Sequence, residues 1–264
     1  MDQRPFVELR DVSLTYGRDE ERVPAIEELT LDIARGDFIA IVGPSGCGKS
    51  SLMKLVTGLL PPTLGAIFVE GKQVTRPVRG VGMAFQNSTL MPWRTTLSNI
   101  MLPFEIVQGH KHRLRRHRKE YEAQAQQLLA AVGLGKFGEK FPWQLSGGMQ
   151  QRANLCRALI HEPGLLMLDE PFGALDAFTR EELWSVMQKL WMTKKFTAIL
   201  VTHDLREAVY LSNTVYVMSQ RPGRIIYKSD VDLPRPRTLQ MTFDPKFVDI
   251  VHALREQISH EHTL

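Results

Sequence analysis

The stretch GPSGCGKS, Gly43 to Ser50, has the residue types and the spacing that bind a nucleoside triphosphate. It follows the apolar run FIAIV and precedes apolar residues at helical spacing from Leu52 to Leu59. Glycines let the backbone curl so that its N–H groups meet on phosphate oxygens, and the helix adds its positive end. Lys49 supplies charge to the β and γ phosphates, and Ser50 offers a hydroxyl to magnesium. A plain glycine-rich turn is the alternative.

Two carboxylates end a second apolar run, LLMLDEP. Asp169 comes at the end of the expected strand, where its carboxylate can hold magnesium. Glu170 follows it and can accept a proton from an attacking water. Together the two residues favour hydrolysis of the bound nucleotide. The alternative is a helix cap or a solvated strand end.

The stretch LSGGMQQR offers a second place for an anion. Ser146, Gly147 and Gly148 come at an expected helix start, where a hydroxyl and exposed N–H groups are available to phosphate oxygens. The alternative is a serine that caps the helix, followed by flexible glycines. With the first loop, this stretch predicts two phosphate sites in one chain.

Composition limits the class of protein. The 264 residues suit one globular unit with an insertion, at ~100 to 200 residues per domain. No apolar run approaches the ~18 residues of a membrane span, and the charged start MDQRPFVELR is unlike a signal peptide. Cys47 and Cys156 are far apart without metal-ligand partners, so both are expected to be reduced. The net charge of +4 suits a partner of phosphates or anionic lipid without requiring one.

The hydrophobic pattern predicts an α/β protein. Residues 6–42 alternate as strands with turns, and strand character returns in GAIFVEGKQV and GVGMAFQ. Residues 95–161 are mainly helical and form the expected insertion. PGLLMLDEP and FTAILVTHD, with a helix from Glu181 to Met192 between them, indicate buried central parallel strands. Proline-rich joints (RPGRI, LPRPR) precede a last helix, Pro245 to Ser259.

In this order, the first loop (Walker A), LSGG and LLMLDEP resemble the ATP-binding subunit of an ABC transporter over about residues 6–220. The resemblance implies a P-loop NTPase core with an antiparallel β subdomain and an inserted α-helical subdomain. The expected parts are 1–86 (β subdomain and first part of the core), 87–161 (α-helical signature subdomain), 162–220 (rest of the core) and 221–264 (C-terminal extension).

The resemblance also assigns roles to single residues. Tyr16 falls where the family places an aromatic that stacks on adenine, Gln86 matches the glutamine that contacts magnesium and water, and His203 matches the histidine at the γ-phosphate. Asp176, in GALD, matches a residue that crosses to the opposite subunit. Met149 departs from the usual glutamine but follows the phosphate-facing residues. The ATP-binding set is Tyr16, Gly43, Pro44, Ser45, Gly46, Cys47, Gly48, Lys49, Ser50 and Ser51, and the signature set is Ser146, Gly147, Gly148 and Met149.

The family mechanism implies a homodimer. Two chains would pack head to tail with ATP between them, so that Ser146 of one completes the site of the other, with Glu170, His203 and Gln86 catalytic. Mg²⁺, held through Ser50, Gln86 and Asp169, is the implied cofactor. Permease subunits at the cytoplasmic face of the cell membrane are the implied partners, with an extracytoplasmic solute-binding protein acting indirectly.

Other ABC classes fit less well. A DNA-repair ATPase would carry a long coiled coil between the motifs, but Ser50 and Ser146 are only 96 positions apart. A translation-type protein usually has two cassettes, and this chain has one. MPWRTTLSNI, LSGGMQQR and VMSQRPGRI are most similar to importers of nitrate, sulfonates such as taurine, bicarbonate and thiamine precursors. We expect sulfonate or nitrate import; thiamine-precursor import, or an ATPase acting on nucleic acid, is the alternative.

Three further stretches carry expectations. The apolar stretch Leu90 to Ile106 is expected to receive a permease helix in part and to pack in the core in part. The basic run His110 to Lys119 lacks interleaved aromatics, which favours a solvated face over contact with lipid or nucleic acid. The stripe on the later helix is assigned to the core: Leu183, Met187, Leu190 and Trp191. No ligand site is expected in the C-terminal extension.

Overall fold

The computed structural model describes residues 4–17, 21–107, 109–173 and 175–261. The chain forms two compact units, the first from Met1–Val78 with Lys195–Leu264 and the second from Arg79–Lys194. Ala174 of the GALD stretch and the first three residues lie outside the described residues. The four predicted parts of the chain stay a prediction.

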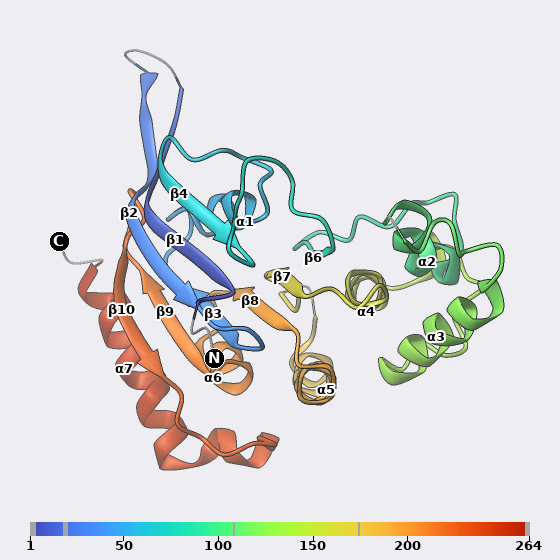
Figure 1. The fold of residues 1–264 in the computed structure, drawn as a ribbon. Helices are drawn as coiled ribbons and strands as arrows, with labels where there is room; N and C mark the ends of the chain where they lie inside the picture. The colour runs from blue at the N-terminus through green and yellow to red at the C-terminus, as the bar shows by residue number, and fades with distance from the viewer. Residues whose placement is uncertain (1–3, 18–20, 108, 174, 262–264) are drawn as a thin grey trace. The chain divides into compact units, whose positions relative to one another are not determined.

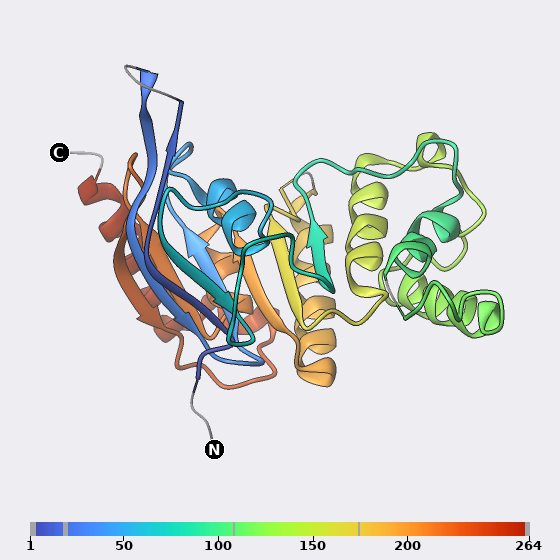
Figure 2. The same ribbon diagram turned by 45° about the horizontal axis from the view of Figure 1, so that its top comes forward.

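An antiparallel sheet forms one part of the first unit (Figure 1). Its strands follow the order β2-β1-β4-β5. In the last part of β2, residues alternate between buried and exposed, as in a sheet with one face covered. The strands are β1 (Val7–Tyr16), β2 (Val23–Ile33), β4 (Leu64–Val69) and β5 (Lys72–Gln73). Figure 2 shows β1 and β2 as the long blue pair.

A mainly parallel sheet forms the other part of this unit, in the order β10-β9-β3-β8. β3 runs parallel to both β8 and β9, and β10 closes the edge antiparallel to β9. All five residues of β3 and of β8 are buried. The prediction of a buried central parallel strand in FTAILVTHD is therefore confirmed by β8. The strands are β3 (Phe38–Val42), β8 (Thr197–Val201), β9 (Thr214–Met218) and β10 (Ile225–Asp230).

Helices follow these strands at one edge of the sheet. α1 (Lys49–Val56) begins just after β3, and α6 (Leu205–Leu211) just after β8. The chain ends in a short 3₁₀ helix, η3 (Leu239–Phe243), and in α7 (Pro245–Glu261), which contacts α6, β9 and β10. The predicted last helix is confirmed, and Figure 1 shows it in red.

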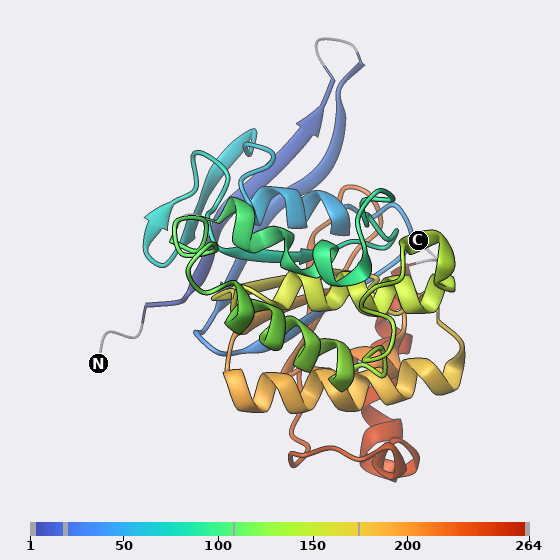
Figure 3. The ribbon, with the colours of Figure 1, turned by 90° about the vertical axis from the view of Figure 1, so that its right-hand side faces the viewer.

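The second unit is mainly helical, as the pattern of residues 95–161 predicts. A short parallel pair, β6 (Val81–Ala84) and β7 (Leu165–Asp169), accompanies the helices. Leu183, Met187 and Trp191 of the predicted stripe are buried, and Leu190 is half-buried, so the core assignment is confirmed for three of the four. The helices are α2 (Thr96–Ile106), α3 (Arg118–Ala131), the 3₁₀ helix η2 (Pro142–Gln144), α4 (Gly147–Leu159) and α5 (Ala177–Lys194). Figure 3 shows α3, α4 and α5 side by side.

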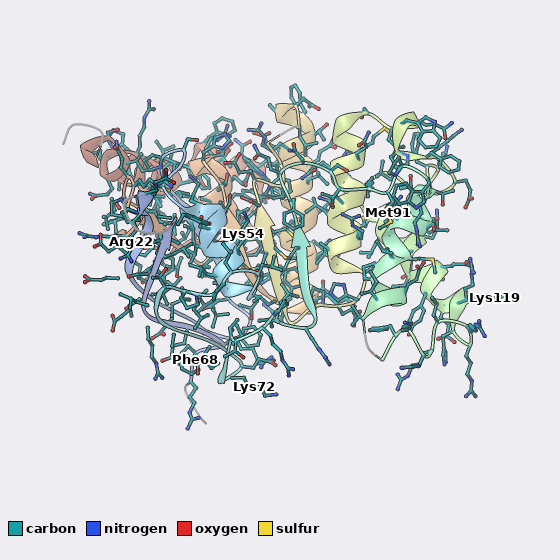
Figure 4. All side chains as sticks on the ribbon, turned by 90° about the horizontal axis from the view of Figure 1, so that it is seen from above. Arg22, Lys54, Phe68, Lys72, Met91 and Lys119 are labelled. Carbon is teal, nitrogen blue, oxygen red and sulfur yellow. The ribbon has the colours of Figure 1, made fainter. Side chains whose placement is uncertain are left out.

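The basic run from His110 to Lys119 lies on the surface of this unit. Nine of its ten residues are Lys, Arg or His, and all of its Lys and Arg side chains are exposed. Figure 4 shows Lys119 directed away from the helices. A solvated face is therefore what the structure shows. Within the described residues, no helix has the length and apolar character that crossing a membrane requires.

Candidate nucleotide site

The loop between β3 and α1 holds its lysine ammonium inside the loop itself. The Lys49 side chain is buried, and its Nζ donates to the carbonyls of Gly43 at 2.8 Å and Pro44 at 2.7 Å. The Cys47 Sγ lies 3.7 Å from the same nitrogen. Among the described residues no side chain caps the start of α1, so the N–H groups of its first turn keep their capacity to bind an anion. A phosphate oxygen here would meet both the ammonium and the helix start.

Gly48 shows why the loop needs glycine at its last turn. Its φ is +105°, in the left-handed region where residues with a Cβ are strained. A Cβ at this position would also lie 2.8 Å from the Ala25 carbonyl oxygen of β2. The conformation that aims the helix start is therefore open only to glycine.

The aromatic ring of Tyr16 is held next to this helix start. Its hydroxyl lies 3.0 Å from the Ser51 Oγ, and the residue is 37% exposed at the end of β1. An exposed ring fixed by its hydroxyl keeps one face available for stacking. Ser45, Gly46 and Ser50 are also exposed in the loop. The adenine role of Tyr16 stays a prediction.

His203 lies at the same end of the sheet as the loop, because both follow the carboxyl ends of parallel neighbouring strands, β8 and β3. Ile41 pairs with Val201, and the Thr202 N–H donates to the Ile41 carbonyl at 3.2 Å. Asp204 then caps α6 by accepting from two N–H groups of its first turn. His203 stands exposed between strand end and helix cap. The first unit therefore brings the predicted histidine and the loop to one edge.

In the second unit, Glu170 and Gln86 are hydrogen-bonded to each other. The Gln86 Nε2 donates to Glu170 Oε2 at 3.2 Å. β6 and β7 are parallel neighbours, with Ala84 opposite Leu168, so both side chains follow strand ends at one edge. Glu170 has a φ of 44°, a left-handed conformation that costs about 1–3 kcal/mol in a residue with a Cβ. Such strain persists where the surroundings fix a functional side chain.

Ser146 of the LSGG stretch caps a helix, which was the alternative to an anion site in the sequence analysis. Ser146 Oγ accepts from the Met149 N–H at 3.3 Å at the start of α4. Ser146 and Gly147 are exposed, and Met149 is half-buried. A Cβ on Gly148 would lie 2.9 Å from Leu175 Cδ2, so the Leu175 side chain would have to shift to admit it. A cap does not exclude an anion at the same helix start, and that role stays a prediction.

Asp176 has a local partner of its own. Its carboxylate accepts from the Thr179 N–H at 3.0 Å near the start of α5. Hydrogen bonds from the Thr179 backbone and side chain hold the pKa of Asp176 below its ordinary value. The carboxylate is exposed and charged at neutral pH, and the predicted contact across subunits stays a prediction.

Two buried polar residues near this site were missed by the sequence reasoning. The side chain of Gln151 donates to the Phe85 carbonyl at 2.9 Å, and that of Asn154 does so at 3.4 Å. Both residues belong to α4 and are almost fully buried. They fix the backbone just before Gln86. The sequence signal for these two residues was their position as polar residues among small and apolar ones in the predicted helix after LSGG.

The apolar stretch from Leu90 to Ile106 divides into two sets, as expected. Its core side chains are buried, whereas Trp93 is 71% and Ile106 66% exposed. Asn99 is buried and binds the chain near Met91 through its side-chain amide and carbonyl. The buried set is Leu90, Ile100, Met101 and Phe104. The docking of a permease helix here stays a prediction.

Taken together, the mixed α/β architecture, the glycine loop with its inward lysine, and the Ser146-capped start of α4 define an ATP-binding cassette. The sequence profile described as "ABC transporter" matches residues 26–173, more than half of the chain. An uncharacterized ABC transporter ATP-binding protein of Methanocaldococcus jannaschii is 43% identical over 239 residues, which are 89% of this chain and 87% of that protein.

Two further comparisons agree. The aliphatic sulfonates import ATP-binding protein SsuB of Bacillus cereus is 38% identical over 232 residues, 88% of each chain. A solved ATP-binding cassette, dimeric in a post-hydrolysis state with ADP and Pi, superposes with a TM-score of 0.74 at 28% identity, covering 86% of this chain and all of that one. The chain belongs to the ABC transporter family as an ATP-binding subunit, and it is an ATPase that energises transport. The predicted family and fold class are confirmed.

Proposed function

We propose that this chain energises the import of a sulfonate such as taurine, or of a related small oxyanion such as nitrate. The observation that carries the proposal is the 38% identity to sulfonate import ATP-binding proteins over 88% of the chain. Solute choice belongs to the permease and the extracytoplasmic solute-binding protein, so residues of this chain cannot bind the solute themselves. The import of thiamine precursors is the other outcome that the experiment below must separate.

The phosphates of ATP would bind at the loop of the first unit. The Lys49 ammonium exchanges its two carbonyl partners for β- and γ-phosphate oxygens, which carry full negative charge and bind it more strongly. The N–H groups at the start of α1 bind the same oxygens. Mg²⁺ supplies charge neutralisation at the γ-phosphate when bound. Its protein ligands would be the Ser50 hydroxyl, the Gln86 amide oxygen and the Asp169 carboxylate, a set of oxygen donors that suits this cation.

Hydrolysis would use the carboxylate of Glu170 as a general base. The hydrogen bond from Gln86 orients that carboxylate, and the strained backbone fixes its direction. His203 would donate to the γ-phosphate, where negative charge develops. The water oxygen forms a bond to the γ-phosphorus while its proton passes to Glu170, the bond from that phosphorus to the ADP oxygen breaks, and ADP and phosphate depart.

A second copy of the chain would complete each site. Ser146, Gly147 and Gly148 at the start of α4 present a hydroxyl and N–H groups to the γ-phosphate held by the partner. Asp176 would contact the opposite subunit near the same place. The dimeric post-hydrolysis cassette with ADP and Pi supports this arrangement. Closure around ATP and opening after hydrolysis give two states that can drive a permease.

The partners would place the chain at the cytoplasmic face of the cell membrane, bound to permease subunits. Purification of the complex from native membranes in mild detergent tests this directly. A co-purifying permease supports the proposal, whereas recovery of nucleic acid alone would contradict it. ATPase activity of the reconstituted complex, with its binding protein, is then measured with taurine, nitrate and a thiamine precursor. Stimulation by taurine or nitrate supports oxyanion import, and stimulation by the thiamine precursor alone refutes it.

A further inference from the structure

Three backbone segments of the first unit meet at Gly223. This residue lies in the turn between β9 and β10, in the stretch SQRPGR. Its N–H donates to the Ala25 carbonyl of β2 at 2.9 Å, and its carbonyl accepts from the Glu27 N–H at 3.1 Å. A Cβ at Gly223 would lie 2.1 Å from the carbonyl oxygen of Cys47, in the middle of the phosphate-binding loop. The turn therefore touches both β2 and the loop through bare backbone.

The phosphate-binding loop is contacted by β9 at one end and by β2 at the other. A Cβ on Gly43 would lie 2.8 Å from the Met218 carbonyl oxygen, at the end of β9. At the other end, Gly48 lies against Ala25. The β9–β10 turn covers the middle, at Cys47. The backbone of the loop is thus held along its length by β2, β9 and the turn.

The turn has its own means of keeping its shape. The buried Ser219 hydroxyl accepts from the Arg224 N–H at 2.9 Å and lies 3.0 Å from the Pro222 carbonyl oxygen. On the outer side, the Arg224 guanidinium donates to Glu27 Oε2 at 2.7 Å. The Ser219 contacts fix the shape of the turn, and the Arg224–Glu27 contact ties the turn to β2.

We propose that Gly223 is a positioning residue for nucleotide binding: its lack of a side chain lets the β9–β10 turn press on the Cys47 peptide and so set the curvature of the phosphate-binding loop. A methyl carbon cannot lie 2.1 Å from a carbonyl oxygen. Because both Gly223 and the Cys47 carbonyl belong to the backbone, no flexible side chain can move away to relieve the clash. Either the turn withdraws or the Cys47 peptide rotates. Because hydrogen bonds weaken steeply with angle, N–H groups aimed at phosphate lose strength in both cases.

The test uses the full chain and the variant Gly223→Ala, with Gly135→Ala as the matched control. Gly135 has no left-handed φ, and a Cβ there would meet its nearest atom at an ordinary 3.5 Å, so the same chemical change is made without a clash. A second variant, Ser219→Ala, loosens the turn without adding any atom. ATP affinity is measured by equilibrium titration with magnesium present.

A local readout separates positioning from general loss of stability. The chain has two cysteines, both buried: Cys47 in the loop and Cys156 in α4. Burial raises the pKa of the Cys156 thiol to about 12, so its reaction with iodoacetamide is slow. Alkylation of each cysteine is followed by peptide mass spectrometry in the absence of nucleotide. A displaced Cys47 peptide exposes one thiol, whereas general loosening exposes both.

We expect Gly223→Ala to weaken ATP binding about tenfold, which corresponds to ~1.4 kcal/mol, and to speed alkylation of Cys47 alone. Ser219→Ala should act in the same direction to a lesser degree, and Gly135→Ala should leave both quantities unchanged. Native affinity with native Cys47 reactivity in Gly223→Ala would overturn the proposal, and so would an equal rise at both cysteines. The proposal rests on ATP binding at this loop; if the unaltered chain binds no ATP, the proposed function itself fails, and the Cys47 rates still report the geometry.

Discussion

The guanidinium of Arg237 is buried in the first unit and holds four backbone carbonyls. Its Nη1 donates to Val209 at 2.6 Å, Tyr210 at 3.0 Å and Ser212 at 2.7 Å, and its Nη2 donates to Val231 at 3.1 Å. Three of these carbonyls belong to the end of α6, where helix carbonyls lack partners within the helix. We therefore expect Arg237→Met to be strongly destabilising.

The size of the effect follows from opposing contributions. Each buried carbonyl left without a donor costs about 1–3 kcal/mol. Burial, with a smaller contribution from the neighbouring Arg235, lowers the pKa of Arg237, which means that the charge itself is held there at a cost. Methionine removes that cost and fills similar space. A net loss of roughly 3–5 kcal/mol remains, because several buried carbonyls at once lose their donor.

The assay is thermal unfolding of the nucleotide-free chain, and the expected fall in the midpoint is roughly 10 °C. Arg237→Lys keeps the charge but replaces two donating nitrogens by one, so its midpoint should lie between those of Arg237→Met and the unaltered chain. The control is Arg10→Met, since Arg10 is exposed and contacts Glu8 on its own strand and the face of the Phe68 ring, and its guanidinium donates no hydrogen bond to a buried carbonyl among the described residues. If Arg237→Met unfolds at the same temperature as Arg10→Met, the hydrogen bonds from Arg237 to the four carbonyls contribute nothing to stability, and the reasoning fails.

Three further predictions concern the site and the second unit. Glu170→Gln should keep ATP binding and lower phosphate release by at least ~100-fold, whereas Lys49→Ala should lose binding itself; full turnover in Glu170→Gln would remove the general base. Ser146→Arg should retain ATP affinity in titration but not form the closed dimer in gel filtration with ATP, and normal turnover would count against the head-to-tail site. Burial lowers the pKa of His161, so the unfolded chain binds more protons below pH ~6.5 and stability falls with acid there. Unfolding midpoints of His161→Gln should fall less between pH 7 and 5.5, and an identical fall would refute this.

Much of the fold could be predicted because its signals are local. The loop from Gly43 to Ser50 carries its glycines, lysine and serine in one stretch, and runs such as FIAIV are apolar at every position because both faces are buried. Capping and strand ends likewise depend on neighbours in sequence. This is why the nucleotide-binding stretches and their order could be predicted from the amino-acid sequence alone.

The contacts that shape the site depend on partners far away in the chain. Arg237 belongs to LPRPR, which reads as a proline-rich joint, and only the fold shows its guanidinium at the end of α6. Gly223 reads as an ordinary turn glycine, although a Cβ there would meet Cys47. Ser146 is a different case, because the pattern allowed a helix cap and an anion site; the structure shows the cap, and the anion site stays a prediction. Long-range packing, unlike turn chemistry, has no short signature.

The α4 helix would couple the two nucleotide sites of the proposed dimer, in which its first turn contacts the partner's ATP. The helix runs without a break from Gly147 to Leu159, and Gln151 and Asn154 on it grip the Phe85 carbonyl, next to Gln86. A helix with its hydrogen-bond ladder intact moves as a rod. In the proposed dimer, pressure from the partner's nucleotide at one end would therefore be transmitted within this unit to the residue that holds Glu170. Each copy would sense its neighbour's ATP at its own base, with no segment having to refold.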